Sequence, residues 1–200
     1  DISGMHNNDP RYVENTNPIS NLSFDEAAEL AYFGAKILHP QTVTPVRADN
    51  IPVRLKNTMN PSAYGTLISS KTSEGGIKAI AAKDGITAIK IKSGRMLMAY
   101  GFLRSVFEIF ERYKTPIDMI TTSEVAVSLT IDNNENLDKI VKELEDFCSV
   151  EVEQDLTIVC LVGSFEVKKQ GYAVRIFDAL KSIPLRMISY GGSEHNVSIL

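Results

Sequence analysis

The segment Pro116-Ile117-Asp118-Met119-Ile120-Thr121-Thr122-Ser123-Glu124-Val125-Ala126-Val127-Ser128-Leu129 has the pattern of a strand, a tight polar turn and a second strand. The same pattern returns over residues 184–199. An internal repeat is stronger evidence of architecture than any single residue. The chain therefore carries two copies of one small module. Equivalent positions lie 68 residues apart before the turn and 70 apart after it, as in the pairs Met119 with Met187 and Glu124 with Glu194.

The first copy has the element order of a ferredoxin-like fold. Alternating and amphipathic patterns predict a strand, a helix, two strands, a second helix and a closing strand. This order is the split βαβ arrangement, which buries one face of a sheet under two helices. The predicted elements cover residues 86–92, 101–114, 116–120, 125–131, 133–147 and 150–153.

The second copy lacks a closing helix and strand. Two explanations stay open: the chain is truncated, or a strand predicted at 77–82 completes the second module from before the first. The chain starts at Asp1 without a methionine and stops at Leu200 inside a strand pattern, so we expect a fragment of a longer protein. The elements predicted for this copy cover residues 156–162, 168–181, 184–189 and 195–200.

The N-terminal section has a different organisation. Residues 1–21 have the composition of a loop. Ser23 and Glu26 have the spacing of a capping box, which starts a helix. Residues 69–76 contain no apolar side chain and end in two glycines, which indicates a linker. The elements predicted between these segments are a helix from Ser23 to about Lys36, a short helix over 41–48 after Pro40, and a strand over 51–56.

Composition and charge narrow the class of partner. Hydrophobic residues make up 44% of the chain and charged residues 23%, which is typical of a globular protein. The formal net charge of −4 disfavours a nucleic-acid partner. The longest apolar run, residues 156–162, is too short to cross a bilayer, so we expect no membrane segment and no signal peptide. Cys148 and Cys160 lie in or beside apolar stretches and are expected to be reduced core thiols of a cytoplasmic protein.

Five segments resemble aspartate kinases (aspartokinases), in the order in which that family has them. Asp1 to Arg11 is similar to the family's nucleotide-site loop, and Phe33 to Pro40 resembles its Phe-Gly-Ala-Lys-Val-Leu-His-Pro segment. Ile51 to Ile68 resembles the end of the catalytic domain. Gly101-Phe102-Leu103 and Ile120-Thr121-Thr122-Ser123-Glu124 resemble signatures of the first regulatory ACT domain. The resemblance covers essentially the whole chain and is nearest to the lysine-sensitive class.

The resemblance implies an α+β fold. Tandem ferredoxin-like (βαββαβ) ACT modules would follow the C-terminal tail of an α/β amino-acid-kinase domain. In this family the first ACT domain is inserted within the second, which agrees with a strand at 77–82 completing the later module. The expected divisions are a catalytic-domain remnant at 1–68, a linker at 69–76, a first ACT domain at 83–155, and an incomplete second ACT domain made of 77–82 and 156–200.

The resemblance also implies a nucleotide site in the N-terminal section. The parent enzyme would use ATP with magnesium, and cationic side chains suit its phosphate oxygens. We expect no catalytic residue, no metal site and no bound cofactor in this fragment, because the family's N-terminal part is missing. An exposed loop histidine and a solvated helix end remain the alternative interpretations of His6 and Lys36. The nucleotide-site candidates are Asp1, Gly4, His6, Arg11 and Lys36.

A second candidate site suits a free amino acid. Gly101 opens a helix whose unpaired backbone N–H groups can hold a carboxylate, and Asp118 can pair with an ammonium group. The resemblance implies that this effector lies between the first ACT domains of two chains. Core packing of Met96 and Phe102, and turn roles for Thr122 and Ser123, remain alternatives. The implied contacts are Met96, Gly101, Phe102, Leu103, Asp118, Thr122, Ser123 and Glu124.

The function that follows is feedback regulation. The parent enzyme would transfer the γ-phosphoryl group of ATP to the side-chain carboxylate of aspartate. The fragment would be inactive alone. As a homodimer it would sense an end-product amino acid, for which lysine is the leading candidate. Arg186 stands where the first copy has Asp118, so the second module is expected to dimerise without binding the same ligand. Two alternatives stay open: an ACT dimerisation module without ligand, or part of a bifunctional aspartate kinase/homoserine dehydrogenase.

Overall fold

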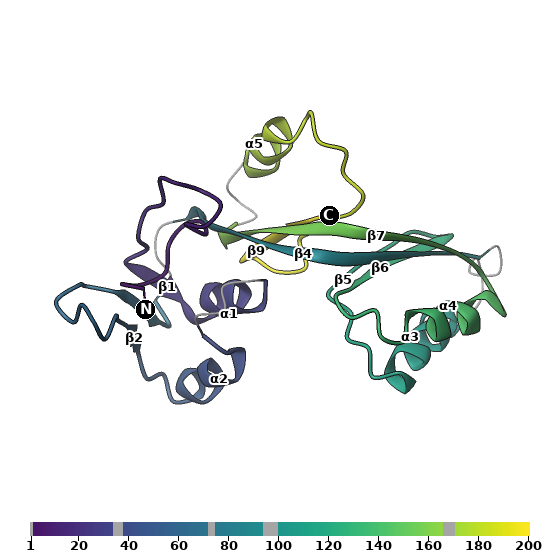
Figure 1. Ribbon diagram of the computed structural model, residues 1–200, viewed down its shortest axis with the longest axis horizontal. Helices are drawn as coiled ribbons and strands as arrows, with labels where there is room; N and C mark the ends of the chain where they lie inside the picture. Colours follow the sequence, from purple (N-terminus) through teal and green to yellow (C-terminus); the bar gives the residue numbers. More distant parts are fainter. Residues whose placement is uncertain (1, 34–37, 72–74, 94–99, 166–170) are drawn as a thin grey trace. The chain divides into compact units, whose positions relative to one another are not determined.

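The computed structural model describes residues 2–33, 38–71, 75–93, 100–165 and 171–200, and Figure 1 labels their elements. The fold is α+β, as predicted. The helices are α1 (Phe24–Tyr32), α2 (Pro40–Ala48), α3 (Phe102–Arg112), α4 (Leu137–Glu145) and α5 (Tyr172–Ala179). The strands are β1 (Asn21–Ser23), β2 (Val53–Leu55), β3 (Thr66–Ser69), β4 (Gly76–Lys92), β5 (Met119–Thr122), β6 (Ala126–Ile131), β7 (Ser149–Ser164), β8 (Ile188–Tyr190) and β9 (Asn196–Ile199).

The described strands form two sheets. One has three strands in the order β1-β3-β2, and the other has six in the order β5-β6-β4-β7-β9-β8. The chain also divides into two compact units. The domain boundaries expected from the sequence stay predictions. The first unit comprises residues 1–82, 159–185 and 190–199, and the second comprises 83–158, 186–189 and 200.

Helix α1 begins at the predicted capping box. Ser23 Oγ accepts a hydrogen bond from Glu26 N at 3.1 Å, and Glu26 Oε2 accepts one from Ser23 N at 2.8 Å. The helix ends at Tyr32 with Phe33 as its cap, so the predicted extension to Lys36 was wrong in length. Strand β1 was missed, because three residues that pair in parallel with β3 leave no periodic pattern in the sequence.

Strands β4 and β7 are each longer than predicted. The sequence pattern predicts two strands in place of each, with breaks near Gly85 and Asp155. Gly85 (φ +74°) and Asp155 (φ +58°) do adopt the left-handed conformation, but each lies inside one continuous strand. A single left-handed residue bends a strand without ending it. Each long strand therefore continues in the sheet before and after its left-handed residue.

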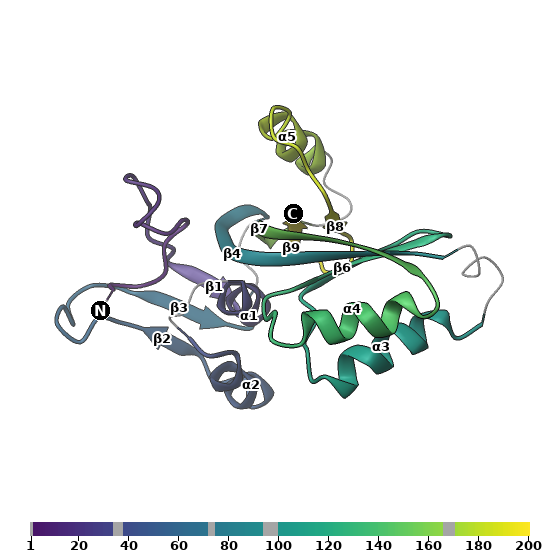
Figure 2. The same ribbon diagram turned by 45° about the vertical axis from the view of Figure 1, so that its right-hand side comes forward.

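The first ferredoxin-like module is confirmed in the second unit. Figure 2 shows α3 and α4 side by side on one face of β4 and β6. The core joins strand residues such as Ile89 and Leu129 to helix residues such as Val106 and Ile140, all fully buried. Leu103 and Phe107 lie in the same helix as Val106, but they are 38% and 40% exposed. They lie on the flank of α3 and leave apolar surface uncovered.

Both cysteines are free thiols. Cys160 is fully buried, and burial raises the pKa of its thiol to about 12. Cys148 is half-buried and donates to Leu144 O, and burial raises its pKa to about 11. The buried position of Cys160 agrees with the prediction of a core thiol. In the part of the chain that the structure describes, every helix is too short or too polar to span a membrane.

Candidate effector and nucleotide sites

The start of helix α3 opens onto a groove. Gly101 precedes the helix in the left-handed conformation (φ +86°), which favours glycine, and no side chain of the described residues caps the helix start. The first-turn N–H groups are therefore available to an anion. The groove has a volume of about 410 Å³ and is lined by Ser93, Tyr100, Gly101, Phe102, Arg104, Ser105, Glu108 and Phe147.

Phe102 has a packing role as well as a place in this groove. Its ring meets Phe147 edge to face with centroids 6.0 Å apart, and it contacts the core of the first module. The core-packing interpretation of Phe102 therefore holds for its ring, while its backbone belongs to the helix start. Leu103 follows on the exposed flank. Met96 lies outside the described residues.

The turn after β5 lies at the same end of the sheet as Gly101. Thr122, Ser123 and Glu124 are exposed. Ser123 closes the turn, because its N and Oγ both donate to Ala126 O, at 2.8 and 3.4 Å. Ser93 N donates to Val125 O at 3.3 Å, which ties the turn to the end of β4. Three of the predicted effector contacts are thus gathered at the end of the sheet from which the chain leads to α3.

Asp118 lies at the opposite end of β5. Its N donates to Thr130 O at 2.9 Å, next to the pair that Met119 forms with Thr130. A strand rises about 3.3 Å per residue, so Asp118 and Thr122 are separated by roughly 13 Å. Asp118 is not among the residues that line the groove. One chain does not bring its two predicted anchors, Gly101 and Asp118, to one ligand.

The carboxylate of Asp118 is buried and incompletely paired. Its side chain is 4% exposed, and Oδ1 accepts from Lys83 Nζ at 3.2 Å. Lys83 Nζ also pairs with Asp132 Oδ2 at 2.6 Å. Among the described residues Asp118 Oδ2 has no hydrogen-bond partner. Burial raises the pKa of Asp118, and the charge of Lys83 offsets part of that rise. Burial by itself lowers the pKa of Lys83, but its bond to Asp132 and the charge of Asp118 raise it overall.

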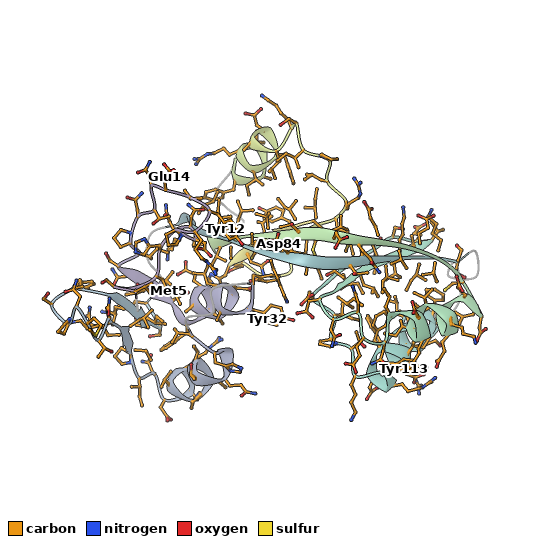
Figure 3. The ribbon with its side chains drawn as sticks, viewed as in Figure 1. Met5, Tyr12, Glu14, Tyr32, Asp84 and Tyr113 are labelled. Carbon is orange, nitrogen blue, oxygen red and sulfur yellow. The ribbon has the colours of Figure 1, made fainter. Side chains whose placement is uncertain are left out.

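The nucleotide candidates are only partly brought together. His6 and Arg11 line one pocket of about 520 Å³, together with apolar side chains that include Met5 and Tyr12, labelled in Figure 3. His6 Nδ1 bonds Thr16 Oγ1 at 2.8 Å, and Arg11 pairs with Asp9 at 2.6 Å on the surface. The apolar lining of this pocket was not predicted.

The other nucleotide candidates lie elsewhere. Gly4 has a structural role: it is buried with φ +123°, and a Cβ there would meet Thr66 Oγ1 at 2.9 Å. Glycine is required at such a position, because both the conformation and the space exclude a side chain. Asp1 and Lys36 lie outside the described residues. Among the residues that are described, no group of three His, Cys, Asp or Glu side chains is arranged to hold a metal.

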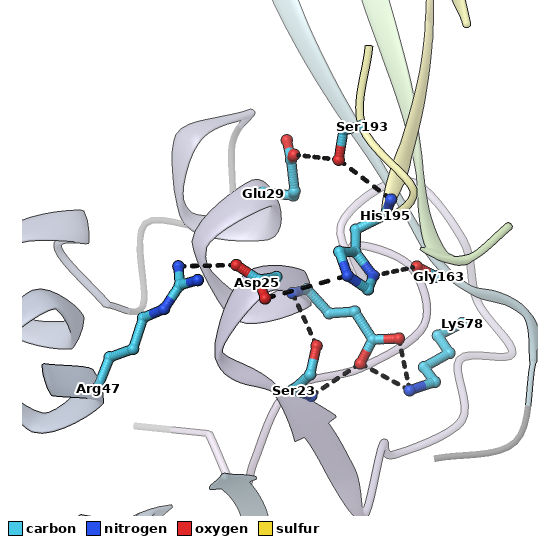
Figure 4. Close-up of polar contacts among 9 residues, drawn as sticks. Ser23, Asp25, Glu29, Arg47, Lys78, Gly163, Ser193 and His195 are labelled. Carbon is cyan, nitrogen blue, oxygen red and sulfur yellow. Dashed lines mark hydrogen bonds and ion pairs between the residues drawn. The ribbon is translucent and has the colours of Figure 1, made fainter. Parts of the chain in front are cut away.

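The first unit contains a polar cluster that the sequence does not predict. Figure 4 shows α1 bonded to the hairpin before β9 and to the start of β4. Glu29 accepts from Ser193 Oγ at 3.1 Å and from Asn196 Nδ2 at 2.6 Å. Lys78 Nζ lies 2.6 Å from Glu26 Oε1. These contacts join the N-terminal section to the second module. No sequence signal links positions so far apart.

Comparison with known proteins identifies the parts. The amino acid kinase family matches residues 1–57, and an ACT domain matches residues 159–200. The chain is 39% identical to "Aspartokinase 3, chloroplastic" of Arabidopsis thaliana, covering all of this chain and 38% of the relative. It is 38% identical to lysine-sensitive aspartokinase 3 of Escherichia coli K12, covering all of this chain and 46% of that protein. The chain thus spans less than half the length of these curated relatives.

Two solved structures align with the whole chain and a third with part of it. Escherichia coli aspartokinase III in complex with aspartate and ADP superimposes with a TM-score of 0.90 at 38% identity, over 100% of this chain and 46% of its own. Its complex with lysine and aspartate gives 0.86 at 39% identity with the same coverage. A chain described as a C-terminal regulatory domain of aspartate kinase from Porphyromonas gingivalis W83 is 54% identical, with a TM-score of 0.54 over 60% of this chain and 83% of its own.

Fold and matches together define a class: ferredoxin-like ACT regulatory modules that follow the tail of an amino-acid-kinase domain. Within that class the relatives and the solved structures point to one family over the full length of the chain. The chain belongs to the aspartokinase family.

Proposed function

We propose that the chain is the regulatory portion of an aspartate kinase. The complete enzyme would transfer the γ-phosphoryl group of ATP to the side-chain carboxylate of aspartate. The superposition on Escherichia coli aspartokinase III with aspartate and ADP, at a TM-score of 0.90, carries this proposal. Two free thiols suit a reducing, cytoplasmic location. The proposed divisions are those expected from the sequence: 1–68, 69–76, 83–155, and 77–82 with 156–200.

The N-terminal section would contribute to the ATP site of the complete enzyme, where magnesium would accompany the nucleotide. His6 and Arg11, which share one pocket, are the supported members of this set. Asp1 and Lys36 are proposed on the resemblance alone, and Gly4 would act by shaping the loop. The fragment holds only one side of such a site, so we propose no activity for it alone.

The effector we propose is lysine. The Escherichia coli relative is named lysine-sensitive, and one of its solved complexes contains lysine. The groove at Gly101 can hold a carboxylate through the first-turn N–H groups of α3. Asp118 can hold an ammonium group. A ligand that carries a carboxylate and an ammonium group therefore fits the two anchors when Gly101 and Asp118 lie close enough to contact the same molecule.

Two copies of the chain would make the anchors meet. Strand β5 is an edge of the six-stranded sheet. Antiparallel pairing of β5 with β5 of a second copy about a twofold axis would set the Thr122 end of one strand against the Asp118 end of the other. Two exposed apolar side chains, Ile120 in β5 (36%) and Val125 in the turn after it (50%), would be buried by the same contact. Each site would then take its carboxylate anchor from one copy and Asp118 from the other.

The second module has a different charge at the equivalent place, which favours a second role. Arg186 stands where the first module has Asp118, and it pairs with Glu153 at 2.8 Å. A guanidinium there does not attract the ammonium group of an amino acid. We therefore propose that this module contributes to dimerisation and does not bind the same ligand. A lysine bound at the second module would contradict this.

Asp118→Asn in the complete protein tests the effector site. The amide keeps the shape of the side chain but removes the charge that would hold an ammonium group, so we expect lysine inhibition to weaken by about tenfold or more. Kinase activity without lysine should stay near that of the wild type. The measurement is the lysine concentration that halves activity.

The control for this test is Asp155→Asn, which changes an exposed carboxylate at a left-handed position that asparagine also tolerates. It should leave lysine inhibition unchanged. An Asp118→Asn enzyme that is inhibited by lysine as strongly as the wild type would remove Asp118 from the site. A dimer that persists in this variant would show that the lost response does not come from lost assembly.

A further inference from the structure

One ion pair recurs in both modules with its charges exchanged. Lys83 pairs with Asp118 in the first module, and Glu153 pairs with Arg186 in the second. The two pairs occupy equivalent positions of the internal repeat. Lys83 and Glu153, in the long strands β4 and β7, are 70 residues apart, and Asp118 and Arg186, before the short strands β5 and β8, are 68 apart. This position therefore holds a cation and an anion in each module, but only the first module presents the carboxylate from the short strand.

The two pairs differ in how completely they are matched. Arg186 donates to both oxygens of Glu153 at 2.8–3.0 Å, so that one guanidinium serves one carboxylate. In the first module Lys83 serves two carboxylates, Asp118 at 3.2 Å and Asp132 at 2.6 Å. Among the residues that the structure describes, this cluster pairs two carboxylates with one ammonium group and is therefore one cation short.

The two bonds of Lys83 differ in burial and in length. Asp118 lies underneath, with a side chain 4% exposed, while Lys83 and Asp132 are 26% and 36% exposed. The bond to Asp118 is also the longer of the two. Asp118 Oδ2 is buried without a partner among the described residues, and a buried acceptor that makes no hydrogen bond costs free energy. A further N–H donor at Asp118 would relieve that cost.

We propose that Lys83 is an internal competitor for the ammonium group of the effector. In the empty site Lys83 is shared between Asp118 and Asp132. When the effector binds, its ammonium group takes Asp118, and Lys83 moves wholly onto Asp132. Each carboxylate then has a cation of its own. The inference rests on the proposed function, since it assigns to Lys83 and Asp132 the setting of effector affinity at that same site.

The affinity for the effector depends on the fraction of molecules in which Lys83 is bonded to Asp132 and not to Asp118. A site that is competent only in a fraction of molecules binds with an apparent affinity reduced by that fraction. Lys83→Met removes the competitor and leaves Asp118 open, so the Kd for lysine should fall. Asp132→Asn removes the alternative position for Lys83, which then stays on Asp118, so the Kd should rise. The two changes act in opposite directions, which a merely structural role for the cluster does not predict.

The experiment is calorimetric titration of the complete protein with L-lysine. We expect the Kd to fall about fivefold in Lys83→Met and to rise about fivefold in Asp132→Asn, the change that one partly exposed ion pair makes. The control is Lys181→Met, which breaks an exposed ion pair (3.2 Å to Asp178) that shares no residue with the candidate site and should leave the Kd unchanged. Asp132 is exposed, so its variant is expected to fold even if the Lys83 variant is less stable.

The outcomes separate this inference from the function on which it rests. A wild-type protein that does not bind lysine contradicts both. Lysine binding that Asp118→Asn abolishes, but that Lys83→Met weakens or leaves unchanged, overturns the role of Lys83 and leaves the effector site standing. A fall in Kd for Lys83→Met with a rise for Asp132→Asn supports the exchange of partners.

Discussion

Lys78→Met is expected to lower the free energy of unfolding by about 3 kcal/mol or more, because it strips the cation from a buried carboxylate. Glu26 is 1% exposed in its side chain, Lys78 is 12% exposed, and the two charges lie 2.6 Å apart. Glu26 is also the carboxylate that accepts from Ser23 N in the capping box of α1. The variant therefore weakens the contact between α1 and β4. Denaturant unfolding of the complete protein measures the change.

Two comparisons make this prediction specific. Lys181→Met breaks an exposed pair, 76% and 72% exposed, and should change stability by less than about 0.5 kcal/mol. The double variant of Lys78→Met with Glu26→Gln should recover part of the loss, since it no longer leaves a buried charge unpaired. Equal losses in the Lys78 and Lys181 variants would show that the first pair is no more buried in solution than the second.

Gly163→Ala is expected to destabilise the protein by about 3 kcal/mol, the upper range for overpacking where backbone must move. A Cβ at Gly163 would lie 2.0 Å from Gly76 O and 2.9 Å from Gly76 C. These are backbone atoms, so no side-chain rotation relieves the clash. Because Gly163 is in β7 and Gly76 begins β4, the variant tests whether the first part of β4 lies against the second module. Thermal or denaturant unfolding gives the change.

The matched control is Gly192→Ala, in the longer turn of the second module. In the part of the chain that the structure describes, no heavy atom lies within 4 Å of a Cβ placed there, and the φ of Gly192 is outside the left-handed range. We expect a change within about 0.5 kcal/mol. If the two variants behave alike, β4 does not approach β7 at this point, and the proposal that residues 77–82 complete the second module fails.

Features encoded within a few residues were predictable from the sequence. The start of α1 was predicted because its capping box spans only Ser23 to Glu26. The first module was predicted because apolar residues recur with the period of a strand or of a helix in each of its elements, and because the same order of elements is repeated later in the chain. The continuity of β4 and β7 was not predicted, since Gly85 and Asp155 are residue types that commonly mark the end of a strand.

In the candidate site too, features encoded locally were predicted and those that depend on the fold were not. Gly101 and the turn at Ser123 were found because a helix start and a tight turn are local patterns. The partners of Asp118 were not found, since Lys83 lies 35 residues before it and only the fold brings the charges together. The separation of Gly101 from Asp118 also depends on the fold, because Asp118 precedes β5 whereas Gly101 lies with Ser93 near the turn that follows it.

The most direct test of the central claim is thermal unfolding of the complete protein with lysine, threonine or methionine in large excess. Ligand at about 100 times its Kd adds roughly 2.7 kcal/mol to the folded state. We predict a rise in unfolding temperature with lysine that is absent in Asp118→Asn and not seen with threonine or methionine. No rise with lysine, or the same rise in Asp118→Asn, would contradict a lysine sensor built on the first module.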